Sequence, residues 1–122
     1  MIGGNTKTPT PSVLFQKRED FIGGAGIVAK HLASAGAKVS FTTVLGKDNL
    51  NHFVKKDLKS MNIKLNIIED VSRPTTNKNC IITDQYKMLK IDKLDNQPIS
   101  EKIIKKISKI IKKNNSEIII FS

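Results

Sequence analysis

Two adjacent glycines, Gly23 and Gly24, stand directly before a segment of small side chains and are the first candidates for chemistry. The first backbone N–H groups of a helix have no intrahelical partner, and glycines let a ligand approach them closely. Such groups suit a hydroxyl or phosphate oxygen of a ligand. Gly23 and Gly24 are therefore candidate substrate-binding residues.

A second candidate group lies in the stretch "PTTNK", residues 74–78. Lys78 would supply positive charge, and Thr76 beside Thr75 would supply hydroxyl hydrogen bonds, to an anionic ligand. On the residues alone, the favoured interpretation of this stretch is a turn that leads into a strand.

The glycines also allow a different interpretation, because residues 24–29 (GAGIVA) fit the G-x-G-x-x-A dinucleotide fingerprint. That fingerprint follows a buried apolar strand, whereas the preceding run here, "QKREDFI", is mostly charged. An NAD-binding Rossmann-type domain thus stays open. A third possibility involves no ligand: a glycine turn followed by close helix packing on Ala25, Ala29 and Ala33.

The remaining polar candidates predict no catalytic or metal site. His31 and His52 fall in expected helices without partnering cysteine or carboxylate spacing, so neither a metal site nor a catalytic triad is expected. Asp48 is explained as the N-cap of a helix, a role that needs no ligand. No catalytic residue is assigned.

The elements that must position these residues alternate along the chain. Helices are expected at 25–35, where Gly36 stops the helix, at 48–61 and at 100–113, with apolar stripes that include Val28, Ala29 and Leu32 in the first. Strands are expected at 38–45, 63–69, 79–83, 86–92 and 117–121, with an extended piece at 12–18. The last strand is continuous and apolar, as in strands buried on both faces.

This order predicts an α/β fold with a partly parallel sheet. The hairpin at 79–92 and the N-terminal extended piece fall outside the helix–strand alternation. They are expected to form a small second sheet.

Composition places the chain among globular proteins, with 39% hydrophobic and 26% charged residues. The net charge is +10, but 19 of the 21 basic residues are lysine and only Arg18 and Arg73 are arginine. Nucleic-acid readers favour arginine and interleaved aromatic residues, so no nucleic-acid partner is expected. No apolar run approaches the roughly 20 residues that span a membrane. The single Cys80 indicates a reducing compartment, and cytoplasmic localisation is expected.

Three separated segments, in this order, resemble the ribokinase-like (PfkB) carbohydrate kinases: the proline-rich extended piece, "FIGGAGIVAKHLASAGAKVSFTTVLGKD", and "SRPTTNKNCIITDQYKMLKID". The most similar branch is that of the heptose-phosphate kinases. The resemblance runs from about Pro9 to Ser122. It departs from the family pattern at Ile27, where Asn is usual, and at Cys80 and Lys90, where Arg is usual.

The resemblance implies a partial ribokinase-like fold, a three-layer α/β/α half with a small β lid sheet. Residues 1–122 would be a single truncated domain, with lid segments at about 9–24 and 74–93 and the α/β core at about 25–70 and 98–122. It also implies that Gly23, Gly24, Thr76 and Lys78 contact a carbohydrate or sugar phosphate. Pairing through the lid, giving a homodimer or higher oligomer, is expected as well.

The implied reaction is transfer of the ATP γ-phosphate to a carbohydrate hydroxyl, with Mg²⁺. The "GAGD"-type stretch that carries the base and nucleotide site in the family does not occur in this sequence. The chain is therefore expected to be a truncated reading frame or excised piece that is inactive alone. A non-catalytic sugar-phosphate or nucleotide binding module remains the alternative, beside the NAD-binding domain.

Overall fold

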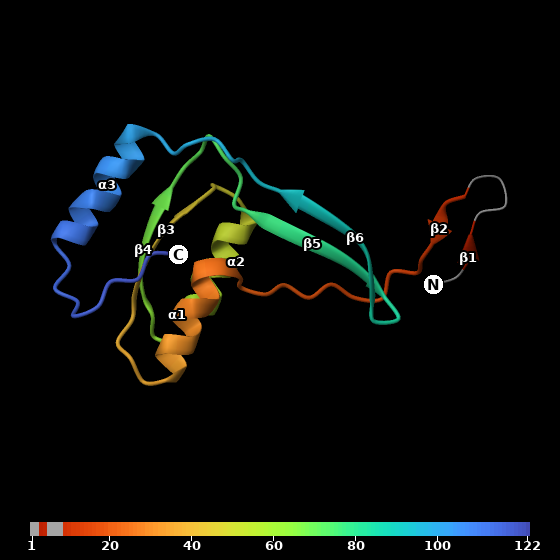
Figure 1. Ribbon diagram of the computed structural model, residues 1–122, viewed down its shortest axis with the longest axis horizontal. Coiled ribbons are helices and arrows are strands. Elements are labelled where there is room, and N and C mark those ends of the chain that lie inside the picture. Colours follow the sequence, from red (N-terminus) through yellow and green to blue (C-terminus); the bar gives the residue numbers. More distant parts are fainter. Residues whose placement is uncertain (1–2, 5–8) are drawn as a thin grey trace. The chain divides into compact units, whose positions relative to one another are not determined.

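The computed structural model describes residues 3–4 and 9–122 (Figure 1). Its elements are, in chain order, β1 (Gly3–Gly4), β2 (Pro11–Ser12), α1 (Gly24–Ser34), β3 (Ser40–Leu45), α2 (Asn49–Lys59), β4 (Lys64–Glu69), β5 (Asn77–Thr83), β6 (Tyr86–Lys93) and α3 (Glu101–Lys112). This mixture confirms the α/β class. Within the described ranges, no helix has the length and apolar character that crossing a membrane requires.

The chain divides into two compact units. The helical unit comprises Ile22–Thr76 and Leu94–Ser122, and the hairpin unit comprises Met1–Phe21 and Asn77–Lys93. Gly23, Gly24 and Thr76 thus belong to the helical unit, and Lys78 belongs to the hairpin unit.

The helical unit is built on the parallel pair β3–β4, which runs in register from Ser40 opposite Lys64 to Leu45 opposite Glu69. Parallel neighbours require a crossover connection, and α2 supplies it. The predicted parallel pairing and the predicted helix between the strands are therefore confirmed.

The core of this unit forms where α1 and α2 cover one face of the sheet. Leu58 of α2 is completely buried, and Ala29 of α1 and Ile63 are nearly so. Phe41 and Leu65, which lie opposite each other on β3 and β4, pack against them.

Helix α1 buries a different stripe from the one the sequence predicted. Its buried residues are Gly26 and Ala29, with Ala33 partly buried, whereas Val28 and Leu32 are both 37% exposed. Small side chains let the helix backbone approach the core closely, which favours this face over the bulkier one. The alternative of close packing through alanines is thus confirmed for Ala29 and Ala33, and the stripe through Val28 and Leu32 was wrong.

Gly36 ends α1 as predicted. Its φ is +90°, and the N–H of Ala37 donates to the carbonyl of Leu32 at 3.0 Å, while the N–H of Gly36 donates to Ala33 at 3.0 Å. These two bonds are those of a Schellman motif, in which glycine takes the left-handed conformation without strain.

Helix α3 contacts β4 and lies on the other side of the parallel pair from α1 and α2 (Figure 1). Ile103 is buried and so is Ile68, whose side chain alternates to the sheet face opposite Leu65. Ser100 occupies the N-cap position, but its side chain makes no capping bond. Ile104, which follows Ile103 in α3, is exposed.

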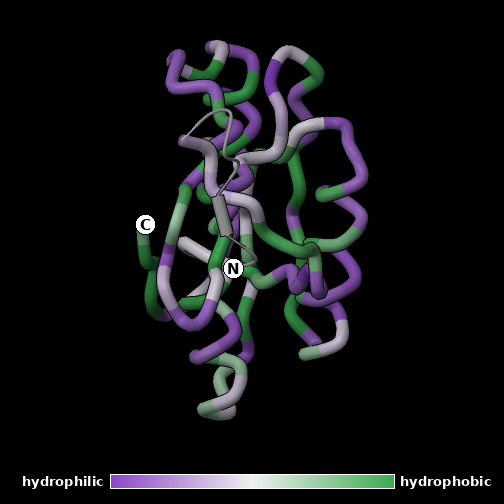
Figure 2. Tube along the Cα trace, turned by 90° about the vertical axis from the view of Figure 1, so that its right-hand side faces the viewer, coloured by the Kyte–Doolittle hydropathy of each residue, from purple (hydrophilic) through white to green (hydrophobic). Residues whose placement is uncertain are grey.

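The predicted strand at 117–121 is wrong. Residues 117–121 form neither helix nor strand, and Ile118 and Phe121 are 76% and 80% exposed. Figure 2 shows this C-terminal segment as a continuous hydrophobic stretch. An apolar strand of this kind is buried only between neighbouring strands, and the described part of the parallel sheet consists of β3 and β4.

In the hairpin unit, β5 and β6 pair antiparallel, with a bulge between Ile81 and Ile82. Asp84 and Gln85 connect them with φ values of +47° and +67°, the signs of a type I′ turn. The predicted hairpin is confirmed. The predicted single second sheet is not, because β1 and β2 form a separate antiparallel pair and residues 13–23 contain no strand.

Candidate functional site

The predicted glycine site lies at the start of α1. Gly23 is the N-cap in an extended conformation (φ −122°), and Gly24 takes a left-handed φ of +53°. Both are exposed, no side chain caps the helix, and a Cβ built on either residue would meet no atom within 4 Å. The N–H of Gly26 donates to the Gly23 carbonyl at 3.1 Å, so the N–H groups of Gly24 and Ala25 are those from which an oxygen of a ligand can accept at this helix start.

Gly26, two residues further on, is required for packing rather than for ligand access. A Cβ on this buried residue would collide with the Ile22 side chain, which folds back over the first turn. The dinucleotide interpretation also needs a buried strand before Gly23. Residues 13–23 contain none and are almost all exposed, an observation against that interpretation.

Asp48 is the N-cap of α2, as predicted, and it also bonds a distant segment. Its Oδ1 accepts from the N–H of Asn51 at 3.1 Å, and its Oδ2 accepts from the N–H of Thr75 at 2.8 Å. Burial raises the pKa of this carboxyl, but the hydrogen bonds from Thr75, Asn51 and Leu50 together outweigh it and hold the pKa below the ordinary value. Asp48 is therefore charged at neutral pH and joins two loops.

Gly46 completes this junction. Its N–H donates to Thr75 Oγ1 at 3.0 Å in a buried bond. A Cβ on Gly46 would lie 2.5 Å from the Thr75 nitrogen and 2.6 Å from the Arg73 carbonyl oxygen. Only glycine therefore lets the segment after β4 pass so close to the loop after β3.

Asn51 is 3% exposed and lies behind the same loop. Its Nδ2 donates to the Gly46 carbonyl at 2.7 Å and to Glu69 Oε1 at 3.2 Å. Glu69 also accepts from Lys55 Nζ at 2.9 Å, and chiefly this bond lowers the pKa of Glu69. Within the described ranges, the buried Oδ1 of Asn51 has no hydrogen-bond partner.

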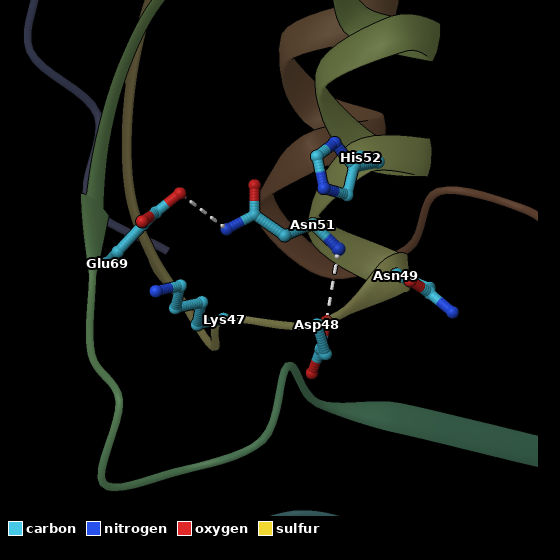
Figure 3. Close-up of a pocket in the computed structure, with 6 residues that line it drawn as sticks. All are labelled: Lys47, Asp48, Asn49, Asn51, His52 and Glu69. Carbon is cyan, nitrogen blue, oxygen red and sulfur yellow. Dashed lines mark hydrogen bonds between the residues drawn. The ribbon is translucent and has the colours of Figure 1, made fainter.

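A small polar cavity of about 150 Å³ opens beside these residues (Figure 3). Its lining consists of polar and charged side chains from the start of α2 and the end of β4: Lys47, Asp48, Asn49, Asn51, His52 and Glu69. The cavity lies at the carboxyl ends of β3 and β4, the edge where parallel sheets bind ligands.

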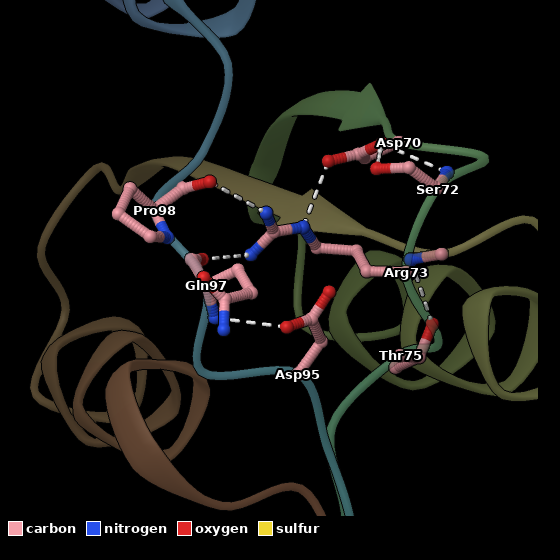
Figure 4. Close-up of polar contacts among 8 residues, drawn as sticks. Asp70, Ser72, Arg73, Thr75, Asp95, Gln97 and Pro98 are labelled. Carbon is pink, nitrogen blue, oxygen red and sulfur yellow. Dashed lines mark hydrogen bonds and ion pairs between the residues drawn. The ribbon is translucent and has the colours of Figure 1, made fainter.

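A second polar cluster follows β4 (Figure 4). Arg73 donates from Nε to Asp70 Oδ2 at 2.8 Å, and from Nη1 and Nη2 to the carbonyls of Gln97 and Pro98, both at 3.1 Å. The hydroxyl and N–H of Ser72 bond Asp70 Oδ1, and with Arg73 they lower the pKa of Asp70. This cluster ties the segment leaving β4 to the segment that leads into α3.

The structure locates the other two candidate residues as follows. Thr76 is exposed, while its neighbour Thr75 is buried and makes the structural bonds. Lys78 is exposed on β5, paired in register with Asp92 on β6. Among the described residues, no backbone hydrogen bond joins Thr76 to Gly23 or Gly24.

Sequence reasoning missed Gly46, Asn51 and Arg73. Asn51 occupies the third helical position after Asp48, where a capping box carries Glu or Gln, and this spacing was the available signal. His52 lines the cavity and His31 is exposed in the last turn of α1. In the part of the chain that the structure describes, no three His, Cys, Asp or Glu side chains gather as metal ligands.

This chain is similar to several known proteins, one of which is a sugar-phosphate kinase by name. It is 31% identical over 86 residues to a D-beta-D-heptose 7-phosphate kinase of Bordetella bronchiseptica, a match that covers 70% of this chain and 28% of the relative. It is 33% identical over 108 residues to the bifunctional protein HldE of Bradyrhizobium diazoefficiens, covering 86% and 22%, and 35% identical over 89 residues to that of Rhodopseudomonas palustris, covering 70% and 18%.

The chain thus spans little more than a quarter of the length of these relatives, or less. The family match covers nearly the whole of this chain, because the model of the pfkB family carbohydrate kinases matches residues 3–119. The chain belongs to the pfkB family of carbohydrate kinases.

Proposed function

We propose that this chain carries the substrate-binding lid segments and the first part of the α/β core of a sugar-phosphate kinase. The observation that carries the proposal is the start of α1, where no side chain caps the helix and no atom crowds Gly23 or Gly24, in a chain that matches the pfkB family over residues 3–119. The reaction of the whole enzyme would be transfer of the ATP γ-phosphate to a carbohydrate hydroxyl.

The family implies a ribokinase-like fold for the complete domain. In this proposal the core segments at about 25–70 and 98–122 belong to a three-layer α/β/α arrangement. The segments at about 9–24 and 74–93 belong to a β lid. The contacts of both α2 and α3 with β4 support the layered arrangement.

The substrate class is a phosphorylated sugar, as the names of the heptose 7-phosphate kinase relatives suggest. Two groups of this chain suit it: the N–H groups at Gly23 and Gly24, and the exposed Thr76 and Lys78. The N–H groups would bind a hydroxyl or phosphate oxygen, and the ammonium of Lys78 would neutralise part of the phosphate charge.

ATP and Mg²⁺ are the cofactors of kinases in this family. The described residues do not fit the metal, since no three His, Cys, Asp or Glu side chains among them gather as ligands. We therefore assign no phosphoryl-transfer step to this chain and expect it to be inactive alone. A non-catalytic sugar-phosphate-binding module is the second candidate function, and the start of α1 without a side-chain cap would serve it equally.

We also propose that the chain self-associates and acts in the cytoplasm. The exposed side chains of Ile118, Ile120 and Phe121 and the hairpin residues Ile82 and Tyr86 support self-association, because exposed apolar clusters favour contact between molecules. Cys80, an exposed free thiol, supports a reducing compartment.

Titration calorimetry of the purified chain with a heptose 7-phosphate, a hexose 6-phosphate, ATP and NAD tests the proposed function. We expect a sugar phosphate to bind, and Lys78→Ala to weaken binding by about tenfold, the size of one lost charge-assisted bond. Lys102→Ala, on the exposed face of α3, is the control and leaves binding unchanged. Heat from NAD alone would favour the dinucleotide interpretation, and equal binding by Lys78→Ala would move the site elsewhere.

A further inference from the structure

The chain leaves the helical unit after Thr76 and returns to it at Leu94. Between these points lies the segment 77–93, and side chains of the helical unit hold the chain directly before and after it. One set of hydrogen bonds, the first tie, holds Thr75 just before this segment. Another, the second tie, holds Gln97 and Pro98 shortly after it.

The first tie fixes Thr75 at two atoms. Its N–H donates to Asp48 Oδ2 at 2.8 Å, and its Oγ1 accepts from the Gly46 N–H at 3.0 Å. Thr75 is 6% exposed, and the bare backbone of Gly46 lets the Arg73–Thr75 segment pack directly against it. Because Thr76 follows in the chain, fixing Thr75 sets the position from which Thr76 extends.

The second tie is the Arg73 guanidinium. Asp70 orients it through an ion pair of 2.8 Å between largely buried side chains, and its other two nitrogens each bond one carbonyl of the returning segment. Five donors in a rigid plane make arginine suited to bridging several acceptors at once. The segments before and after residues 77–93 are therefore held relative to each other within the helical unit.

We propose that Thr75 is a positioning residue for substrate binding. It holds the backbone of Thr76 in the position that binding of the sugar phosphate requires. Gly46 and Asp48 act through Thr75, and Arg73 with Asp70 holds the returning segment. This inference rests on the proposed function, because Thr76 is one of its binding residues.

The test compares Thr75→Val with Thr75→Ser. Valine keeps the shape but removes the hydroxyl, leaving the Gly46 N–H without its acceptor, whereas serine keeps the hydroxyl. Calorimetry with a heptose 7-phosphate should show affinity weakened about tenfold in Thr75→Val and restored to within about twofold in Thr75→Ser. Amide hydrogen exchange without ligand should speed up at Gly46, Thr76 and Asn77 in the valine variant alone.

Ile63→Ala is the control for a general loss of stability, because Ile63 is buried in the core away from the two ties. It should unfold more easily yet bind as tightly as the original chain while folded. If Thr75→Val does not fold, Asp48→Asn serves instead. Its amide can keep only one of the two acceptor roles of the carboxylate, so it too should weaken binding.

The outcomes separate the two proposals. Binding by the original chain with no loss in a folded Thr75→Val or Asp48→Asn variant would overturn the positioning role and leave the proposed function standing. Absence of binding by the original chain would overturn the proposed function and, with it, this inference. A loss in Ile63→Ala equal to that in Thr75→Val would reduce the role of Thr75 to general stability and so overturn the inference.

Discussion

Gly46 has no space for a side chain, because backbone atoms of Arg73, Pro74 and Thr75 lie where its Cβ would be. Gly46→Ala must move one backbone segment away from the other and strain the bonds to Thr75 and Asn51. We expect it to lower the free energy of unfolding by roughly 3 kcal/mol, measured by urea denaturation.

Gly23→Ala is the matched control for this prediction. A Cβ at Gly23 would meet no atom, and its φ of −122° suits any residue. Its stability should change by less than about 0.5 kcal/mol. A Gly46→Ala variant as stable as Gly23→Ala would contradict the close packing at Gly46.

At the scale of single residues, the sequence predicted the roles that depend on neighbouring residues and missed those that depend on residues distant in the chain. The N-cap role of Asp48 and the stop at Gly36 follow from residues within one helical turn, and both are confirmed. The partner of Gly46 is Thr75, 29 residues away, so nothing local marked Gly46 as a packing residue. Whether Gly23, Gly24, Thr76 and Lys78 bind substrate stays a prediction.

Among the elements, the β5–β6 hairpin carries strain in its turn. Gln85 has a φ of +67°, a left-handed conformation that costs a residue with a side chain about 1 kcal/mol relative to glycine. Gln85→Gly should therefore stabilise the hairpin, seen as slower amide exchange in β5 and β6. Asn115→Gly, at an exposed position outside any helix or strand, is the control, and equal or faster exchange in Gln85→Gly would contradict the turn geometry.

The elements also show where sequence patterns lose their power. Helices with a strong apolar period and a hairpin with a short polar turn were predicted within a few residues of their observed bounds. The strand predicted at 117–121 was wrong, because its hydrophobicity predicts burial between neighbouring strands and the described sheet does not provide them. The predicted apolar stripe of α1 was wrong because the small residues Gly26 and Ala29 let the helix backbone lie close to the core. This close approach outweighed the larger area that bulkier side chains would bury.

Across the whole molecule, the carboxylates of the two polar clusters make stability depend on pH. The pKa values of Asp48, Glu69 and Asp70 are all lowered in the folded state. The folded chain therefore binds fewer protons than the unfolded chain in acid. This contribution to stability is complete above the ordinary pKa values and is lost as the pH falls through the lowered ones.

Urea denaturation at a series of pH values between 7 and 3 checks this dependence. Asp70→Asn removes one of the three groups and should flatten the decline in acid. Glu101→Gln, on the exposed surface of α3, should leave the slope unchanged. An Asp70→Asn curve parallel to that of the original chain would show that the Arg73 cluster does not contribute.

The most direct test of the central claim is an NMR titration of the isotope-labelled chain with a heptose 7-phosphate. The proposed site predicts saturable shifts of the backbone amide signals of Gly23, Gly24 and Ala25, together with those of Thr76 and Lys78. Shifts confined to Asn49 and His52 would place the ligand in the cavity at the start of α2 instead. No shift at any of these residues would contradict sugar-phosphate binding by this chain.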